Sequence, residues 1–501
     1  MPHSLLVAGT TSDAGKTVIT TAICRALARR GMRVAPFKAQ NMSNNSMVTF
    51  AGAEIGRAQW IQAVAAGATP EAAMNPVLLK PSSDLRSQVV VMGEPAGHLD
   101  AQEYAGGRAR LRDAAFAAYD DLSARFDAVI CEGAGGIAEI NLRPWDYVNL
   151  GLAQHGSIPT IVVGDIDRGG VFASLYGSLA VLDEADQRLV AGFLINRFRG
   201  DAGLLAPGLE QLQGLTGRPT YGVVPWADGM WLDSEDALAI DSRPRTDSPD
   251  ALRVAVVLLP RISNFTDIDA LTLEPHVDVS FVRSPAGLAD ADLVVLPGTR
   301  ATIADLSWLR ARGLDRAITE HVAAGRAVLG ICGGCQMLGA DITDTAGVEG
   351  DPGAAATGLG LLDVTTTFDA SKRLELVHGT EFGAAVSGYL IHHGRIRRGA
   401  RAESFLDGAR RGTAYGTMWH GALESDGFRR AFLARVAEHV GRSGFRANPR
   451  LSFADARNAR IDRLADLLEQ HVEVDALVDL VVCGVPAELP FIPAGPGRLS
   501  R

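Results

Sequence analysis

The chain has 501 residues, 47% of them hydrophobic and 21% charged, which is ordinary for a folded protein of two to four domains. Its net charge of −10 argues against a general nucleic-acid binder, and no apolar stretch is long enough for a transmembrane helix. The five cysteines are odd in number and widely scattered, which predicts free thiols in a reducing compartment, the cytoplasm.

Short apolar runs in the first half of the chain predict buried strands. Each run is followed by a glycine-rich or polar turn and then by the periodicity of an amphipathic helix. This alternation is typical of βαβ units, so we expect an α/β fold with a parallel sheet. The predicted strands of this half comprise residues 5–8, 129–131, 160–163 and 191–195.

A polar segment with two prolines, residues 241–250, predicts a linker, and the same alternation begins again after it. The new strands are expected at residues 254–259, 293–296 and 327–330. An amphipathic segment at 461–480 precedes a tail rich in proline and glycine. We therefore predict one α/β domain at 1–240, a second α/β domain at 251–440, and a C-terminal helical extension and tail at 441–501.

The first predicted site is a phosphate-binding loop between the first strand and a helix. Backbone N–H groups of the loop and the helix N-terminus would hold ATP phosphates, Lys16 would reach the β/γ-phosphates, and the hydroxyl of Thr17 would bind Mg²⁺. In the common spacing the first glycine would fall on Thr10, whereas this chain has Gly9 one position earlier. The alternative is a glycine-containing turn without a ligand. The predicted nucleotide-binding residues are Gly9, Thr10, Asp13, Gly15, Lys16 and Thr17.

A carboxylate is expected near the metal, because Mg²⁺ prefers oxygen ligands. Glu132 ends the apolar run 128–131 and precedes a run of glycines, and Asp13 lies within the loop itself. Both are candidate ligands beside Thr17. The alternative for Glu132 is that it only caps a turn.

The second predicted site is a nucleophile elbow at Cys332. A strand, a tight glycine turn and a helix surround this cysteine, and the helix N-terminus favours a thiolate. The backbone N–H of Gly333 would contribute to an oxyanion hole, and Gly298 in the turn 296–299 is expected to supply the second donor. Because Cys335 completes a Cys-x-x-Cys motif, redox exchange, metal binding and two merely buried cysteines are the alternatives.

A cysteine nucleophile requires a base, and three histidines are candidates. His420 follows a predicted strand well downstream, whereas His392 and His393 form a neighbouring pair. Spacing alone does not distinguish His420 from this pair.

Several long motifs resemble one family, that of cobyric acid synthase, the glutamine-hydrolysing amidases of cobalamin biosynthesis. The resemblance extends from residue 5 to about residue 490. It implies a P-loop domain of the dethiobiotin-synthetase type, in which five residues separate Gly9 from Gly15, followed by a class I glutaminase domain. The motifs are residues 36–46, 139–142, 165–172, 196–201, 260–267 and 302–306.

The resemblance also implies a reaction. The family transfers ammonia from glutamine to the b, d, e and g carboxylates of a corrinoid, adenosyl-cobyrinic acid a,c-diamide, and consumes ATP at each step. Cys332 matches the family nucleophile and His420 its base. Cobyrinate a,c-diamide synthase and the ligase–glutaminase pairs of cell-wall amidation share both modules, but the motifs at 40–46 and 165–172 favour cobyric acid synthase. A non-catalytic P-loop protein, such as a partition ATPase, would not need the Cys332 half.

Three positions depart from the pattern of the class. The position two residues after the histidine is usually Glu but is Ala422 here, which leaves open what orients His420. Glu424 lies two places too far along to be assumed to act instead. Cys335 stands where the family usually has an aromatic residue, and Leu390 stands where it often has Glu, so we expect no thiol chemistry at Cys335.

Overall fold

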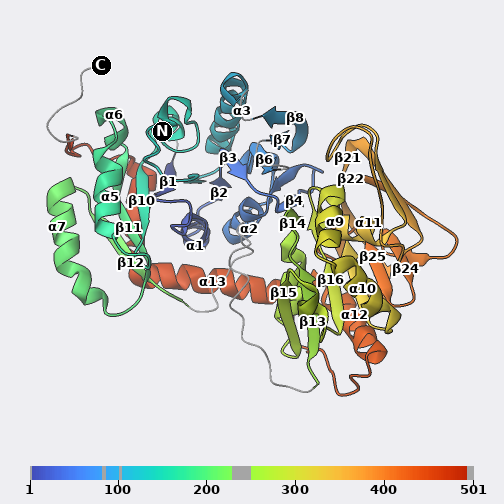
Figure 1. Ribbon diagram of the computed structural model, residues 1–501. Coiled ribbons are helices and arrows are strands. Elements are labelled where there is room, and N and C mark those ends of the chain that lie inside the picture. The colour runs from blue at the N-terminus through green and yellow to red at the C-terminus, as the bar shows by residue number, and fades with distance from the viewer. Residues whose placement is uncertain (1–2, 82–85, 101–103, 228–249, 494–501) are drawn as a thin grey trace.

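The protein is described by a computed structural model that covers residues 3–81, 86–100, 104–227 and 250–493. Two α/β domains lie side by side, and one long helix, α13, runs along both of them (Figure 1). The predicted linker at 241–250 lies outside the described residues except for Asp250. The α/β fold expected from the sequence is confirmed in both halves.

The first domain is built on a six-stranded sheet in the order β12-β11-β10-β1-β9-β2, in which every pairing is parallel. All six residues of the central strand β1 are buried, because helices cover both faces of the sheet. The carboxyl ends of all these strands meet at one edge. The strands are β1 (Ser4–Gly9), β2 (Val34–Phe37), β9 (Ala128–Glu132), β10 (Thr160–Asp165), β11 (Val190–Phe198) and β12 (Thr220–Pro225).

The described part of this domain also contains seven helices and two small sheets, and the small sheets lie toward the second domain in Figure 1. The helices are α1 (Lys16–Arg29), α2 (Arg57–Ala66), α3 (Tyr104–Arg125), α4 (Leu150–Gly156), α5 (Val171–Ala180), α6 (Glu184–Gln187) and α7 (Ala206–Thr216). The small sheets contain β3 (Gln40–Met42), β4 (Ser46–Val48), β5 (Glu54–Gly56), β6 (Val77–Pro81), β7 (Arg86–Val91) and β8 (Glu94–Asp100). Short 3₁₀ turns are η1 (Ala72–Met74), η2 (Arg143–Trp145) and η3 (Ala202–Leu205).

The second domain is built on a seven-stranded sheet in the order β15-β13-β16-β18-β25-β24-β23, with antiparallel pairing only at β24 and β23. The strand predicted at 254–259 is observed at Leu252–Val257, because the backbone turns back when the Leu259 N–H bonds to the Val257 carbonyl. The strands are β13 (Leu252–Val257), β15 (Val277–Val282), β16 (Leu293–Leu296), β18 (Ala327–Ile331), β23 (Glu403–Phe405), β24 (Gly408–Arg411) and β25 (Ala414–Thr417).

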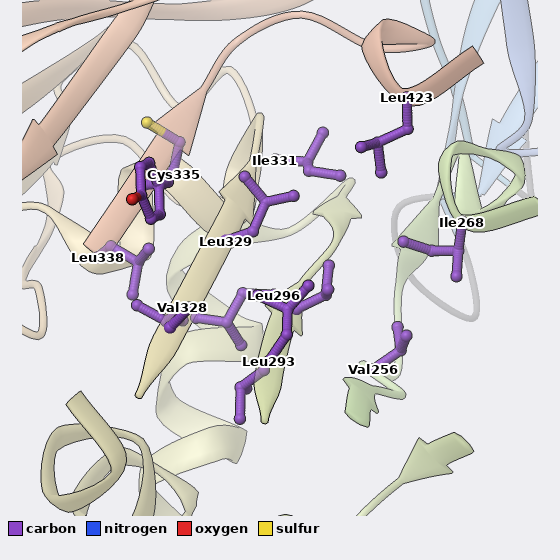
Figure 2. Close-up of a cluster of buried hydrophobic side chains, with 14 of the residues drawn as sticks. Val256, Ile268, Leu293, Leu296, Val328, Leu329, Ile331, Cys335, Leu338 and Leu423 are labelled. Carbon is purple, nitrogen blue, oxygen red and sulfur yellow. The ribbon is translucent and has the colours of Figure 1, made fainter. Parts of the chain in front are cut away.

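Apolar side chains from this sheet and its helices form one core, shown in Figure 2. Leu293, Leu296, Val328 and Leu329 come from the two central strands, and the sulfur of Cys335 lies in the same cluster. The helices and 3₁₀ turns of the domain are η5 (Phe265–Ile268), α8 (Asp269–Thr272), η6 (Pro285–Leu288), α9 (Thr302–Ala311), α10 (Leu314–Ala323), α11 (Gly333–Leu338), η7 (Ala422–Glu424) and α12 (Asp426–His439).

A long antiparallel hairpin projects from this domain and contacts the first one through β4. Met47 and Val48 of β4 form an apolar cluster with Tyr389 and Ile391 of the hairpin, which joins the two domains. The hairpin consists of β21 (Val364–Glu381) and β22 (Ala384–Arg398), and its sheet also holds β19 (Asp341–Asp344) and β20 (Ala354–Thr357), while β14 (Ile262–Ser263) pairs with β17 (Gly298–Thr299).

The C-terminal segment forms two helices that return to the first domain. The amphipathic segment predicted at 461–480 is interrupted, because α13 (Phe453–His471) ends before α14 (Val474–Cys483) begins. The side chain of Phe453 lies in the core of the second domain, whereas Leu464, Leu468 and Leu477 lie in the core of the first. The segment predicted as an extension, 441–501, therefore contains helices that complete the first domain.

Candidate active sites

The phosphate-binding loop joins β1 to α1 at the carboxyl edge of the first sheet. Gly15 precedes the helix with φ of 94°, and a Cβ at this position would lie 2.0 Å from Nδ2 of Asn196. Only glycine fits there, because the backbone is left-handed and the space is filled. The Asn196 side chain in turn donates to the carbonyl of Ala14, which fixes the loop against β11.

Lys16, the first residue of α1, is 5% exposed and folds back over the loop. Its ammonium donates to the carbonyls of Thr11 at 2.8 Å, Ser12 at 2.9 Å and Gly135 at 3.0 Å. These three acceptors are backbone carbonyls of the loop and of the glycine run after β9, so the ammonium of Lys16 lies over the loop. Together with the N-terminus of α1, this arrangement suits a phosphate group.

Thr17 and Glu132 are brought together at the same edge. The hydroxyl of Thr17 donates to Oε1 of Glu132 at 2.8 Å, and Lys38 and Gln62 also donate to this carboxylate. Burial alone would raise the pKa of Glu132, but the charge of Lys38 and these hydrogen bonds hold the pKa below its ordinary value. A hydroxyl beside an ionised carboxylate is the type of donor set that Mg²⁺ takes, so these residues fit the ion.

Asp13, the other predicted ligand, makes a different contact. Its carboxylate accepts from Arg168 at 3.1 Å, and Arg168 is largely exposed. In the described part of the chain, no three His, Cys, Asp or Glu side chains are grouped as a ready metal site. Lys38 and Gln62, which donate hydrogen bonds to Glu132, were not predicted as site residues from the sequence. Lys38 does lie within the motif at 36–46.

Cys332 stands at a strained turn between β18 and α11, with φ of 50° and ψ of −108°. The surrounding glycines permit this turn, since a Cβ on Gly334 would lie 1.9 Å from the Leu296 carbonyl oxygen. The backbone N–H of Cys332 donates to the carbonyl of Thr417 at 2.7 Å, which ties the elbow to β25. This is the strand–turn–helix context that the nucleophile assignment requires.

His420 lies beside Cys332 and is held by a buried carboxylate. Nδ1 of its ring lies 2.7 Å from Oδ2 of Asp267, and Cys332 lies near enough to affect the pKa of the ring. Oδ1 of Asp267 accepts the Gly421 N–H, also at 2.7 Å. Burial alone would lower the pKa of His420, but Asp267 and Cys332 together raise it to about 10. Cys332, His420 and Asp267 thus form a nucleophile, a base and a residue that orients the base.

Asp267 answers the question left open by Ala422, and sequence reasoning did not assign it. The residue lies at the end of the motif at 260–267, in η5, and is 3% exposed. The signal in the sequence that could have identified Asp267 was its place in this motif. Glu424 has another role, because its two oxygens accept from Arg57 of the first domain at 2.8 Å and from Arg457 of α13 at 2.7 Å.

The two glycines predicted for the oxyanion hole lie on either side of this triad. A Cβ on Gly298 would lie 3.0 Å from Cε1 of His420, and one on Gly333 would lie 2.7 Å from Cγ2 of Thr299. The elbow and the turn that begins at Gly298 therefore lie in contact, and a side chain at either glycine would be crowded. That the backbone N–H groups near Gly298 and Gly333 donate to the oxyanion stays a prediction.

The competing histidines and the second cysteine have other surroundings. His392 bonds to the Gly394 carbonyl and His393 to the Asp369 carbonyl, and burial lowers their pKa values to about 3 and about 4, so both rings are neutral. Cys335 is fully buried, and burial raises the pKa of its thiol far above the ordinary value. An inert thiol in a core does not support redox exchange at the Cys-x-x-Cys motif.

Comparison with known proteins relates both domains to described families. Residues 5–237 match the model of the CobQ/CobB/MinD/ParA nucleotide binding domain, and residues 253–428 match that of the CobB/CobQ-like glutamine amidotransferase domain. Proteins called cobyric acid synthase in Mycolicibacterium gilvum and Mycobacterium marinum are each 62% identical over 98% of this chain and 99% of their own length. The chain belongs to the cobyric acid synthase family.

Membership of the cobyric acid synthase family makes this chain an enzyme, a glutamine amidotransferase of the ligase type, and confirms the resemblance seen in the motifs. The alternative of a non-catalytic P-loop protein is thereby set aside.

Among solved structures, one glutamine amidotransferase aligns with 38% of this chain and 98% of its own chain, at 20% identity and a TM-score of 0.30. In the described residues, no helix has the length and hydropathy that a membrane span requires.

Proposed function

We propose that this enzyme amidates the b, d, e and g carboxylates of adenosyl-cobyrinic acid a,c-diamide to give adenosyl-cobyric acid, with ATP and Mg²⁺ at the first domain and glutamine at the second. The observation that carries the proposal is the Cys332–His420–Asp267 triad in a chain that also holds Lys16 and the Thr17–Glu132 pair. The scattered cysteines favour the cytoplasm as the place of this reaction.

The first domain would activate the corrinoid carboxylate. A carboxylate is a poor electrophile, so one of its oxygens takes the γ-phosphoryl group of ATP and ADP leaves. Lys16 would neutralise charge on the β/γ-phosphates, and Thr17 and Glu132 would hold Mg²⁺, which supplies further charge neutralisation there. Ammonia then attacks the carbonyl carbon of the acyl phosphate, phosphate leaves, and the amide remains. The contribution of the domain is positioning and charge stabilisation.

The second domain would release the ammonia. The Cys332 sulfur attacks the side-chain amide carbon of glutamine, and the backbone N–H groups near Gly298 and Gly333 would stabilise the oxyanion. His420 gives its proton to the departing ammonia, so that a glutamyl thioester forms. Water then hydrolyses the thioester to glutamate and restores the thiol. Asp267 keeps the imidazole in the required orientation throughout.

The test is a product assay with the purified protein. The a,c-diamide, ATP and Mg²⁺ are supplied with glutamine in one series and with ammonium chloride in another, and mass spectrometry counts the carboxylates converted. We expect full amidation in both series, and amidation only from ammonium chloride with Cys332→Ser, because the thiol serves only to release ammonia. A wild-type protein that amidates other carboxylates, or none, would contradict the proposal.

A further inference from the structure

Three buried cations and one anion lie between the two domains, close to the nucleophile. Glu54 of β5 accepts from Lys80 of β6 at 2.6 Å and from Lys372 of the hairpin strand β21. Arg300 is the third cation, and its charge acts on both lysines, while the charge of Cys332 also acts on Lys372. Two lysines thus share one buried carboxylate, and the charge of Arg300 lies near enough to act on both of them.

Arg300 differs from the two lysines because, among the described residues, it forms no ion pair with a carboxylate. Lys80 and Lys372 share Glu54, whereas the guanidinium of Arg300 donates to the neutral amide oxygen of Gln88 at 2.8 Å. Arg300 is 7% exposed, and its buried Nε has no hydrogen-bond partner among the described residues. A buried, charged donor without a partner is costly, and a bound anion would remove this cost.

The position of Arg300 relates it to the reacting cysteine. It follows Thr299, whose backbone nitrogen lies 3.1 Å from where a Cβ of Gly333 would be. The N–H of Arg300 donates to the Arg261 carbonyl at 3.0 Å, which ties it to the strand pair β14–β17 that also carries Gly298. Arg300 therefore stands between the elbow and the first turn of α9.

A carboxylate lies at the same helix end. Glu349 accepts the backbone N–H of Thr302, the first residue of α9, at 3.0 Å. The hydroxyl of Thr302 lies 3.2 Å from Oε1 of Gln336 in the helix that begins after Cys332. Burial raises the pKa of Glu349 to about 7, and the charge of Arg300 opposes this rise. Among the described residues no ion pair joins Arg300 to Glu349, so the two opposite charges are near but separate.

We propose that Arg300 binds the α-carboxylate of glutamine and Glu349 its α-ammonium, so that the side-chain amide extends to Cys332. A separated cation and carboxylate beside a nucleophile complement the two charges of an α-amino acid. This inference rests on the proposed function and names the residues that select its nitrogen donor. Because Gln88 belongs to β7, the first domain holds Arg300 and so contributes to glutamine binding in the second.

The experiment compares glutamine with two analogues, each of which lacks one charge. L-glutaminamide has an amide in place of the α-carboxylate, and glutaramic acid has no α-amino group. We expect the wild-type enzyme to prefer glutamine over each by about a hundredfold or more in kcat/KM, because a site built for a charged group rejects an analogue without it. Equal use of glutamine and L-glutaminamide by the wild-type enzyme would overturn the assignment of Arg300 without any variant.

The variants assign each charge to its residue. In Arg300→Met we expect KM for glutamine to rise about a hundredfold and the preference over L-glutaminamide to disappear, whereas the preference over glutaramic acid persists. Glu349→Gln should show the reverse pattern. Arg312→Met, at the exposed far end of α9, is the matched control and should behave as wild type.

Amidation from ammonium chloride distinguishes a loss of glutamine binding from a loss of folding and from a failure of the proposed function. We expect it to stay within about twofold of wild type in both site variants, because free ammonia bypasses the glutamine site. If Arg300→Met also loses this activity, the neutral variant Arg300→Gln decides, and unchanged discrimination against L-glutaminamide in that variant would contradict the assignment. If wild type uses ammonia but no glutamine, the proposed function fails instead.

Discussion

His420 is hydrogen-bonded at 2.7 Å to Asp267, a residue 153 positions earlier in the chain. The class to which this domain belongs usually supplies the orienting carboxylate two residues after the histidine, where this chain has Ala422. Here the carboxylate comes from a different element, η5, and it also binds the Gly421 N–H. The triad is therefore complete, although its third member reaches the ring from another direction.

Replacement of Asp267 by Asn is expected to lower kcat/KM for glutamine by about a hundredfold or more, because the imidazole loses both its orientation and the charge that stabilises its protonated form. Amidation supported by ammonium chloride should be nearly unchanged. The measurement is steady-state kinetics with each nitrogen source. A variant with normal glutamine kinetics would show that Asp267 does not orient the base.

Stability should depend on pH through the same pair. The pKa of His420 is raised from 6.5 to about 10, so the protonated ring stabilises the folded state fully below pH 6.5, and this contribution is lost as the pH rises through about 10. Removing one partner of a buried ion pair costs about 3 kcal/mol. We expect the difference in unfolding free energy between wild type and Asp267→Asn to approach that value at neutral pH and to shrink near pH 10. Denaturant titrations at several pH values measure it, and a difference independent of pH would contradict the pairing.

Lys16→Ala should stop amidation from either nitrogen source. The ammonium of Lys16 would neutralise the β/γ-phosphates during transfer, and loss of such a group costs on the order of a thousandfold in rate. Glutamine hydrolysis should persist, because Cys332 and His420 belong to the other domain. Folded Lys16→Ala protein with a near wild-type rate from ammonium chloride would mean that residues 9–17 are not the phosphate site.

Cys335 is expected to be dispensable for catalysis. Its thiol is fully buried among core side chains (Figure 2), so Cys335→Ala should lower stability by about 1 kcal/mol and leave the glutaminase rate within about threefold. Cys335→Phe is less suitable as a test, because a Cβ on Gly416 would already lie 2.6 Å from Sγ of Cys335 and a larger ring would overfill the space. Loss of activity in a stable Cys335→Ala protein would revive a role for the Cys-x-x-Cys motif.

The sequence was most informative where chemistry depends on neighbouring residues. The strands β1, β9, β10 and β11 of the first sheet and β13, β16 and β18 of the second were predicted because they are buried and appear as apolar runs. Lys16 and Cys332 were found because their motifs are local. Asp267 and Arg300 were missed because their partners, His420 and Gln88, meet them only after folding. For the same reason the amphipathic pattern near 461–480 predicted helix but not the domain that it covers.

Helix α13 has a consequence for how this enzyme can be divided. Its 19 residues extend for about 28 Å, from Phe453 in one core to Leu464 and Leu468 in the other, and ion pairs such as Arg29–Asp466 at 2.6 Å fasten it to α1. A fragment of residues 1–240 would expose the apolar faces of α1 and β1 to water. The halves are thus consecutive in sequence but interleaved in space. An exchange of catalytic halves between members of the family therefore has to transfer residues 461–483 together with the nucleotide-binding half, to whose core they belong.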